Sequence, residues 1–325
     1  MRLVRWWRGA VVAVGSALIA ASAVAQGFPS RPIRMVVPFP PGGSADVGAR
    51  LVSQHMAQSL GQPVVVENRA GAAGNLGADS VAKAPADGYT LLYGIGSIFT
   101  SNPWLYRDMR FDPMKDFVPL TLINAGGGFV LVVPTASPVG SLRELVAAAQ
   151  KQPGRFNYAS YGSGSAPHLV MEMLKSQSGI SITHVPYKGA APAMTAVLGA
   201  EVDAMFDTYI SAAPQLRGGK LRAVAVSTAT RMPTLPNVPA IAETYPGFEA
   251  EGWHGVFAPA GTPRDVVVKL DAALRAAVGS PEVGRWLQDN GLRPGNLSLD
   301  AFAAMLRDDH ARWGRVVRTA GVVAE

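Results

Sequence analysis

The sequence of 325 residues contains no cysteine. This absence excludes a disulfide scaffold, a thiolate metal site, a cysteine nucleophile and a lipid-modified N-terminal cysteine. Charged residues are also scarce at 16%, whereas hydrophobic residues make up 48%. Such a composition is globular and excludes a disordered or coiled-coil chain.

Local enzyme motifs are missing as well. No G-x-S-x-G elbow, no G-x-x-x-x-G-K-[ST] phosphate loop and no H-E-x-x-H zinc motif occurs. Gly162-Ser163-Gly164 supplies only half of a dinucleotide fingerprint, and the five histidines are widely spaced. We therefore expect no metal, no cofactor and no catalytic residue. An exported, hydrolase-like enzyme built from residues distant in sequence is the alternative.

Residues 1–25 have the pattern of an export signal. Arg2, Arg5 and Arg8 form a positive region, an apolar run spans residues 9–21, and Ala23-Val24-Ala25 matches a signal-peptidase site. Cleavage near Ala25 predicts a periplasmic protein. A membrane anchor is the alternative, but the run is short for a span of about 20 apolar residues.

The mature chain is only mildly basic. Without the three arginines of the signal it has 26 basic and 23 acidic residues, a net charge of +3 instead of +6. This charge is too weak and too scattered for a nucleic-acid partner.

Strand and helix patterns alternate along residues 26–325, which predicts α/β lobes with a parallel sheet covered on both faces. Strands are expected at 33–38, 63–67, 90–93, 129–133, 156–159, 183–186, 202–206, 221–227 and 255–259. Helices are expected at 45–60, 70–84, 141–150 (with Ser141 as N-cap), 168–176, 191–198, 265–278, 281–290 and 299–320.

The chain is long for a single core, and two α/β series predict two lobes. The glycine cluster 126–128 is a natural crossover point, and a return is expected near 249–255. We expect a first lobe formed by 26–124 and 249–325 and a second formed by 125–248. A two-crossing hinge would leave a ligand cleft between them.

Two loops that follow strands are the strongest candidate sites, because ligands bind beyond the carboxyl ends of parallel strands. The first, residues 39–46, has two adjacent glycines, and Ser44 could cap the next helix. The second, residues 160–165, is rich in serine and glycine. Each leads into a helix whose free N–H groups favour a negative ligand. Two facing helix starts could hold two carboxylates, or one carboxylate from two sides. Glycine and serine that only make tight turns are the alternative.

Further candidates follow other strands. Ser97 could join the cleft, and Asp46 could cap a helix or accept a hydrogen bond from a ligand. Lys188 could pair with a carboxylate, although an exposed turn lysine is the alternative. Asp207 could accept a hydrogen bond from the ligand or fix its loop.

At these loops the sequence resembles the Bug-type periplasmic solute receptors of tripartite tricarboxylate transporters. The matching stretches span the mature chain in order: residues 38–46, 66–74, 86–92, 158–160 with 164–165 and 168–169, 184–189, 202–207 and 257–263.

The resemblance implies a type II periplasmic-binding-protein fold that closes around a small carboxylate and has no chemistry of its own. A di- or tricarboxylate, an acidic amino acid or an aromatic acid would fit. Delivery to a tripartite tricarboxylate-type permease is implied, with presentation to a membrane sensor kinase as the alternative; a monomer is the default. The ligand contacts that it implies are Phe39, Gly43, Ser44, Ala45, Asp46, Ser160, Ser163, Gly164 and Ser165, with Tyr187, Lys188, Gly189 and Asp207 as weaker candidates.

One departure from the family pattern lies next to the second loop. Pro167 stands where relatives more often carry a small or hydroxylated residue, and it removes one N–H donor. It either alters the pocket or simply fits the first helical turn.

Overall fold

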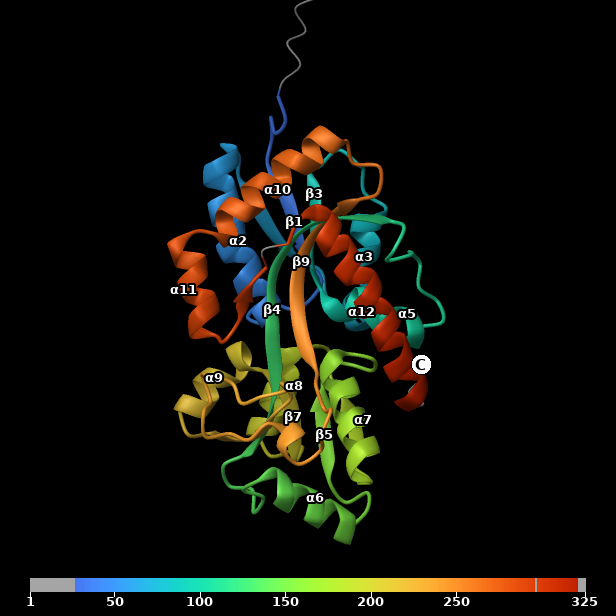
Figure 1. Cartoon of the computed structure of the whole chain (residues 1–325), viewed down its shortest axis with the longest axis vertical. Helices are drawn as coiled ribbons and strands as arrows, with labels where there is room; N and C mark the ends of the chain where they lie inside the picture. The colour runs from blue at the N-terminus through green and yellow to red at the C-terminus, as the bar shows by residue number, and fades with distance from the viewer. Residues whose placement is uncertain (1–26, 296, 321–325) are drawn as a thin grey trace, which may run out of the picture.

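The computed structural model describes residues 27–295 and 297–320. The predicted export signal lies outside the described residues. Within the described part, no helix is both long and apolar enough to cross a membrane. Figure 1 shows two α/β lobes along the long axis of the molecule, connected by a pair of long strands.

The first lobe is built on three parallel strands. β1 (Ile33–Val37) lies between β2 (Val64–Asn68) and β3 (Thr90–Ile95) and pairs in parallel with each. Successive residues of β1 enter different cores, with Met35 on one face and Val36 on the other. Burial of both faces explains why this strand is almost wholly apolar.

Helices cover both faces of this part of the sheet. One face packs against α2 (Ser44–Leu60) and α10 (Arg264–Val278), and α11 (Pro281–Asp289) lies beside α10. The other face packs against α3 (Asn75–Ala82), α4 (Gly96–Thr100) and α12 (Leu299–Ala320), and α5 (Asn102–Leu105) follows α4. The prediction of a covered parallel sheet is therefore confirmed for these three strands.

The second lobe repeats the arrangement. β5 (Asn157–Ser160) lies between β6 (Thr183–Pro186) and β7 (Ala204–Thr208), and all three are parallel. α6 (Leu142–Lys151) and α7 (Ala166–Ser178) pack into one core, and α8 (Ala190–Leu198) and α9 (Tyr209–Arg217) pack into another. Ser141 caps α6 as predicted, because its side chain accepts a hydrogen bond from the N–H of Glu144 at 3.2 Å.

Two long antiparallel strands join the lobes. β4 (Phe117–Pro134) pairs with β9 (Glu251–Pro259) in its first half and with β7 and β8 (Leu221–Val226) in its second half. The predicted strand at 129–133 is only the last part of β4, so that boundary was wrong. Pro119 and Gly126–Gly128 interrupt the strand pattern, and the register with β9 shifts along this stretch.

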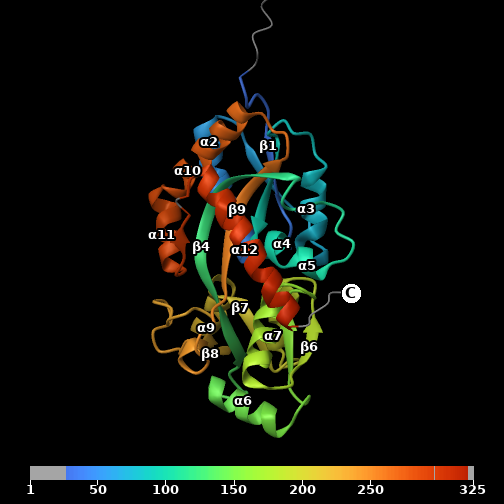
Figure 2. The ribbon, with the colours of Figure 1, turned by 45° about the vertical axis from the view of Figure 1, so that its right-hand side comes forward.

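The C-terminal helix α12 contacts both lobes. Phe302 and Leu306 pack into the core of the first lobe, whereas Trp313 and Val317 pack with α7 in the core of the second. Figure 2 shows α12 running diagonally from the first lobe to α7. It is a third connection beside β4 and β9.

Several short elements were not predicted from the sequence. α4 and α5 follow β3 directly, and α9 follows β7 and contains Pro214. β7 begins two residues later than expected, and the predicted helix 70–84 is a 3₁₀ turn (Ala72–Gly74) followed by α3. Another 3₁₀ turn (Ile241–Glu243) lies in the irregular connection, and β10 (Arg293–Pro294) pairs with β4.

Candidate functional site

A cavity lies between the two lobes. Its volume is about 1180 Å³ including the part open to solvent. Four helices of eight or more residues begin at its wall, one from the first lobe and three from the second: α2 at Ser44, α7 at Ala166, α8 at Ala190 and α9 at Tyr209. Both lobes therefore aim the positive ends of helix dipoles at the same space.

The first turns of these helices leave N–H groups without partners inside the helix. The first helical bond of α2 is donated by Val47 to Gly43, and that of α7 by Leu169 to Ser165. In α8 the corresponding donor is Ala193. Prolines at positions 167 and 192 each remove one of the earlier donors, but they do not interrupt either helix.

The loop at residues 39–46 forms the first-lobe side of the cavity. Ser44 is the first helical residue and not the cap, so that part of the prediction was wrong. Gly43 occupies the cap position with an extended backbone and no side-chain hydrogen bond. Ser44 lines the cavity, and its side chain does not cap the helix.

Asp46 stabilises this loop from behind. It is only 4% exposed, does not line the cavity, and accepts hydrogen bonds from Gly42 N–H at 3.0 Å, Arg50 Nε at 3.1 Å and Asn68 Nδ2 at 2.9 Å. Burial would raise the pKa of Asp46, but these hydrogen bonds outweigh it and lower the pKa below its usual value. Asp46 is therefore an ionised carboxylate that fixes the loop.

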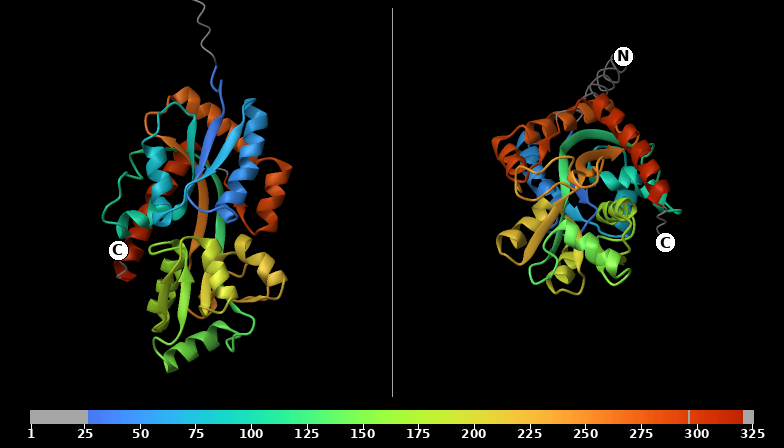
Figure 3. Two further views of the ribbon diagram at one scale, coloured as in Figure 1. Left: turned by 180° about the vertical axis from the view of Figure 1, so that it is seen from behind. Right: turned by 60° about the horizontal axis from the view of Figure 1, so that its bottom comes forward.

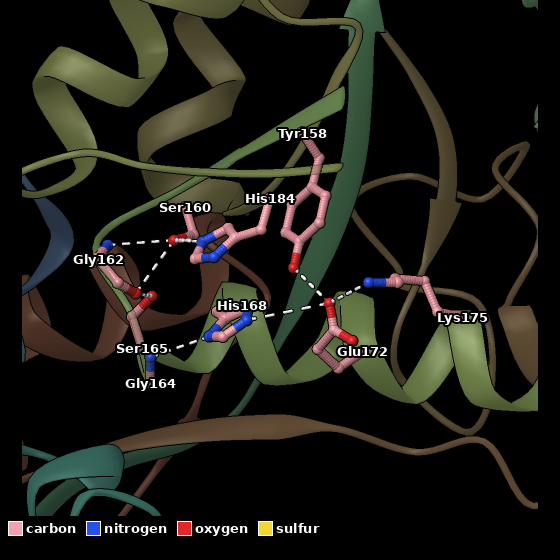
Figure 4. Close-up of polar contacts among 9 residues, drawn as sticks. All are labelled: Tyr158, Ser160, Gly162, Gly164, Ser165, His168, Glu172, Lys175 and His184. Atoms are coloured by element: carbon pink, nitrogen blue, oxygen red, sulfur yellow. Dashed lines mark hydrogen bonds and ion pairs between the residues drawn. The ribbon is translucent and has the colours of Figure 1, made fainter. Parts of the chain in front are cut away.

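The loop at residues 160–165 is held by a network of buried side chains, drawn in Figure 4. Ser160 is fully buried, and its hydroxyl contacts Nε2 of His184 at 2.7 Å. His168 Nδ1 accepts the backbone N–H of Gly164 at 2.9 Å. The two imidazole rings stack with centroids 3.8 Å apart and planes 6° from parallel.

Both histidines are neutral near pH 7. Burial lowers the pKa of His168 and of His184 to about 4. Glu172 lies 3.9 Å from His168 Nε2, but it already accepts hydrogen bonds from Tyr158 and Lys175, each at 2.7 Å. The loop is thus supported by an uncharged acceptor, and protonation of His168 would remove that acceptor.

Six predicted site residues line the cavity: Phe39, Gly43, Ser44, Ala45, Ser97 and Ser165. Among them, the Ser97 hydroxyl oxygen is buried and has no hydrogen-bond partner among the described residues. A buried hydroxyl without a partner is costly unless a ligand or water satisfies it.

The other predicted residues lie outside the cavity wall. Ser163 and Gly164 contact the first lobe instead, because Tyr106 donates its hydroxyl to the Ser163 carbonyl and packs near Gly164. A Cβ at Gly189 would lie 3.0 Å from Pro40, so this glycine also permits a contact between the lobes. Lys188 is exposed, and Tyr187 packs into the second-lobe core.

Asp207 is fully buried behind the wall. One of its carboxylate oxygens accepts hydrogen bonds from the Tyr161 hydroxyl and, at 2.7 Å, from Thr208 N–H. Burial raises the pKa of Asp207 to about 6. Tyr161 and Thr208 both line the cavity, so Asp207 orients two of its lining residues.

Sequence reasoning missed the wall that β4, β9 and α12 contribute. It contains Asn124, Glu251, Trp253, His254, Asp309 and Trp313. Asn124 and His254 are opposite each other in the β4–β9 ladder. These six wall residues lie within β4, β9 and α12 and not in a loop that follows a strand, so no sequence pattern distinguished them from core residues. Among the described residues, no cluster of three or more potential metal ligands occurs.

Comparison with known proteins identifies a family. The model of the family described as "Tripartite tricarboxylate transporter family receptor" matches residues 48–322. A UPF0065 protein from the tcbD–tcbE intergenic region of Pseudomonas sp. strain P51 is 40% identical over 292 residues, 89% of this chain and 86% of that protein. Protein BugT of Bordetella pertussis is 37% identical over 310 residues, 95% of each chain.

Solved structures give the same result. A protein of R. palustris with adipate has a TM-score of 0.88 and 37% identity, covering 92% of this chain and 100% of that one. MatC from Rhodopseudomonas palustris with bound malate has a TM-score of 0.84 and 35% identity, covering 89% and 100%. The periplasmic binding protein BugD has a TM-score of 0.87 and 35% identity, covering 92% and 100%.

The buried His168 makes the stability of the protein depend on pH. A histidine titrates near pH 6.5 when unfolded, and the pKa of His168 is about 4 when folded. Between these values the unfolded chain binds the extra proton, so stability falls as the pH falls. When the pH falls from 7.5 to 5.0, the titration of His168 alone should lower the free energy of unfolding by about 2 kcal/mol.

The measurement is urea unfolding of the wild type and His168→Asn at both pH values, because asparagine keeps an acceptor but cannot be protonated. We expect the variant to lose about 2 kcal/mol less on acidification. Gln177→Asn, at an exposed position of the same helix α7 that carries no titratable group, is the control and should behave as wild type. Equal pH dependence of His168→Asn and wild type would contradict this assignment.

Proposed function

Because this chain belongs to the receptor family of tripartite tricarboxylate transporters, we propose that it binds a small carboxylate in the inter-lobe cavity and delivers it to a membrane permease of that type. The observation that carries the proposal is the convergence of four helix N-termini, from both lobes, on one cavity. Relatives with bound adipate and malate support a carboxylate as ligand.

Backbone donors are suited to this task. Unpaired N–H groups and the helix dipole attract an anion without a buried cation. Ser44 and Ser165 lie at two of the helix starts. The Ser44 hydroxyl can add a hydrogen bond to the carboxylate, whereas the Ser165 hydroxyl donates to the Gly162 carbonyl at 2.7 Å and would have to turn away from it to donate to the ligand. The charged groups near the loops, such as Arg50 and Lys175, are paired with Asp46 and Glu172 behind the wall. These ion pairs stabilise the loops, and the helix dipoles and N–H groups bind the ligand carboxylate.

The two lobes close around the ligand in this proposal, with residues 26–124 and 249–325 moving against 125–248. β4 and β9 are the hinge strands, and the contacts of Tyr106 with Ser163 and of Pro40 with Gly189 belong to the closed form. The permease would read that form. Residues 1–25 would direct the chain to the periplasm, where it acts as a monomer and not as an enzyme.

A thermal-shift screen of residues 26–325 against a library of carboxylates tests the receptor function. A ligand at a hundred times its dissociation constant adds about 2.7 kcal/mol of stability, which corresponds to roughly 1–3 °C for a chain of this size. We expect a shift with at least one carboxylate, followed by recovery of that compound unchanged. Conversion of the compound would instead support an exported enzyme.

The double variant Ser44→Ala with Ser165→Ala tests the two loops. Each lost hydrogen bond should cost about 1 kcal/mol or slightly more, so affinity should fall about ten- to a hundredfold by calorimetry. The matched control is Ser80→Ala with Ser178→Ala, whose hydroxyls donate to backbone carbonyls as that of Ser165 does, but lie outside the cavity wall. Unchanged affinity in the first double variant would remove both serines from the site.

Small-angle scattering tests closure. If ligand holds the lobes together, the radius of gyration of the ligand-saturated protein should be smaller than that of the free protein. The control is the Ser44→Ala, Ser165→Ala protein with the same ligand at a concentration too low to occupy its weakened site. Its radius of gyration should equal that of the free protein. Identical curves for free and saturated wild type would argue against a hinge.

A further inference from the structure

We propose that the ligand is a monocarboxylate with an aromatic body, whose uncharged far end accepts a hydrogen bond from His254. The inference rests on the proposed carboxylate-binding function and narrows it to one ligand class. It follows from three features of the cavity: where its positive field lies, what its walls are made of, and which neutral donors the β4–β9 wall supplies.

The cavity has a positive field at the helix starts but no side-chain cation. None of the described residues that line it is lysine or arginine. Two carboxylates, Glu251 and Asp309, are on the wall formed by β9 and α12. A ligand with one carboxylate can place it at the helix starts, whereas a second carboxylate near β9 would meet acidic groups.

The arginines that pair with these acids lie in a neighbouring hollow. Arg293 contacts Glu251 at 2.9 Å, and Arg312 contacts Asp309 at 2.6 Å. Arg293 and Arg312 line the hollow on the other side of Glu251, Trp253 and Asp309 and do not line the cavity. Trp253 Nε1 also donates to Asp309 at 2.7 Å. Each acid lines the cavity whereas its arginine does not, so a second ligand carboxylate at this wall would meet the acid and would find no free arginine.

The walls offer aromatic surface from every side of the cleft. The first-lobe loop contributes one ring, β4, the loop after β5 and α9 of the second lobe contribute three, and β9 and α12 each contribute a tryptophan: Phe39, Phe129, Tyr161, Tyr209, Trp253 and Trp313. Figure 1 and the reverse view in Figure 3 place β4, β9 and α12 on one side of the molecule and α2 toward the other. Apolar rings around an open space favour a flat, apolar ligand body.

His254 is the neutral donor of the β9 wall. Its Nδ1 lies 3.2 Å from Asn124 Nδ2 and 3.4 Å from the Tyr93 hydroxyl, and both of these groups can donate. Nδ1 is then the acceptor and Nε2 carries the proton. Burial lowers the pKa of His254 to about 4 and raises that of Tyr93, so neither is charged near pH 7.

Ser97 adds a second uncharged group near this position. Ile95 is opposite His254 in the β3–β9 ladder, and Ser97 follows two residues later with its unpartnered hydroxyl. A phenolic hydroxyl or carbonyl on the ligand would satisfy His254 and Ser97 together. A carboxylate there would find two hydrogen bonds but no compensating charge.

Calorimetric titration of residues 26–325 with benzoate, 4-hydroxybenzoate, terephthalate, adipate and citrate tests the inference. We expect 4-hydroxybenzoate to bind at least tenfold more tightly than terephthalate, which differs mainly in a second carboxylate, and than citrate. Tighter binding of terephthalate, adipate or citrate would overturn the ligand class and leave the receptor function intact. Binding of none of the five would overturn the ligand class as well, and the library screen would then decide the receptor function.

Variants locate the effect. His254→Phe keeps a ring but loses the donor. The affinity for 4-hydroxybenzoate should therefore fall about five- to tenfold, while the affinity for benzoate stays within twofold of wild type. His254→Gln should restore part of the lost affinity. His55→Phe, outside the cavity, is the control. Equal losses for both probes in His254→Phe, with no rescue by glutamine, would show a purely structural role and contradict the hydrogen bond.

Removal of the acid at the β9 wall tests the charge argument separately. Glu251→Gln should raise the affinity for terephthalate at least threefold and leave the affinity for 4-hydroxybenzoate nearly unchanged. Glu282→Gln on the exposed face of α11 is the control. No gain for terephthalate in Glu251→Gln would contradict the claim that acidic groups exclude a second carboxylate.

Discussion

Unsatisfied N–H groups at the beginnings of helices are the constraint on which this structure depends. Each helix leaves several such groups, and they need a partner from side chains, water or ligand. Here four helices begin at one cavity. The strand–loop–helix order of both lobes brings this about, because the carboxyl ends of parallel strands deliver every following helix start to the same edge. The position of the cavity is therefore a consequence of the topology, and the side chains refine its wall.

β4 and β9 turn two such edges into one site. The two strands pair antiparallel with each other. β4 also pairs with β7 of the second lobe, and β9 also pairs with β3 of the first. Glycines 126–128 on β4 and the shifted register leave this stretch irregular, which suits a position that would bend in the proposed closure. α12 packs on both lobes beside these strands, so its contacts with α7 must change whenever the lobes separate.

The sequence allowed much of the fold to be predicted but little of the cavity wall. The order of strands and helices was readable because apolar residues repeat with helical or strand spacing, as in β1 and α10. β4 was cut short because Pro119 and its glycines look like a loop, and only pairing with β9 makes them a strand. α9 was missed because Pro214 breaks the helical pattern, although it is held by the Thr208 cap.

For the site, glycine- and serine-rich loops after strands gave a signal, and Ser44, Ser97 and Ser165 lie on the cavity wall. Asp46 and Ser160 were also predicted to contact the ligand but lie behind the wall. A single sequence does not reveal which way a loop side chain turns. His254 and Asn124 gave no signal at all. They face the cavity only because two strands from distant parts of the chain pair there.

Ionised side chains near the cavity are held in ion pairs, and the cations of these pairs lie behind the walls. Asp46 pairs with Arg50, Glu172 with Lys175, Glu251 with Arg293, and Asp309 with Arg312, and each pair fixes an element that reaches the cavity. Apart from Glu251 and Asp309, which are already paired, the polar groups left to meet a ligand are dipoles, hydroxyls, side-chain amides and a neutral imidazole. Such donors need little reorganisation when an anion enters. They also leave no strong buried charge exposed when it departs, because an emptied cavity lined by dipoles can be rehydrated at lower cost than one lined by an unpaired cation. A receptor that must both capture and release its ligand benefits from this arrangement.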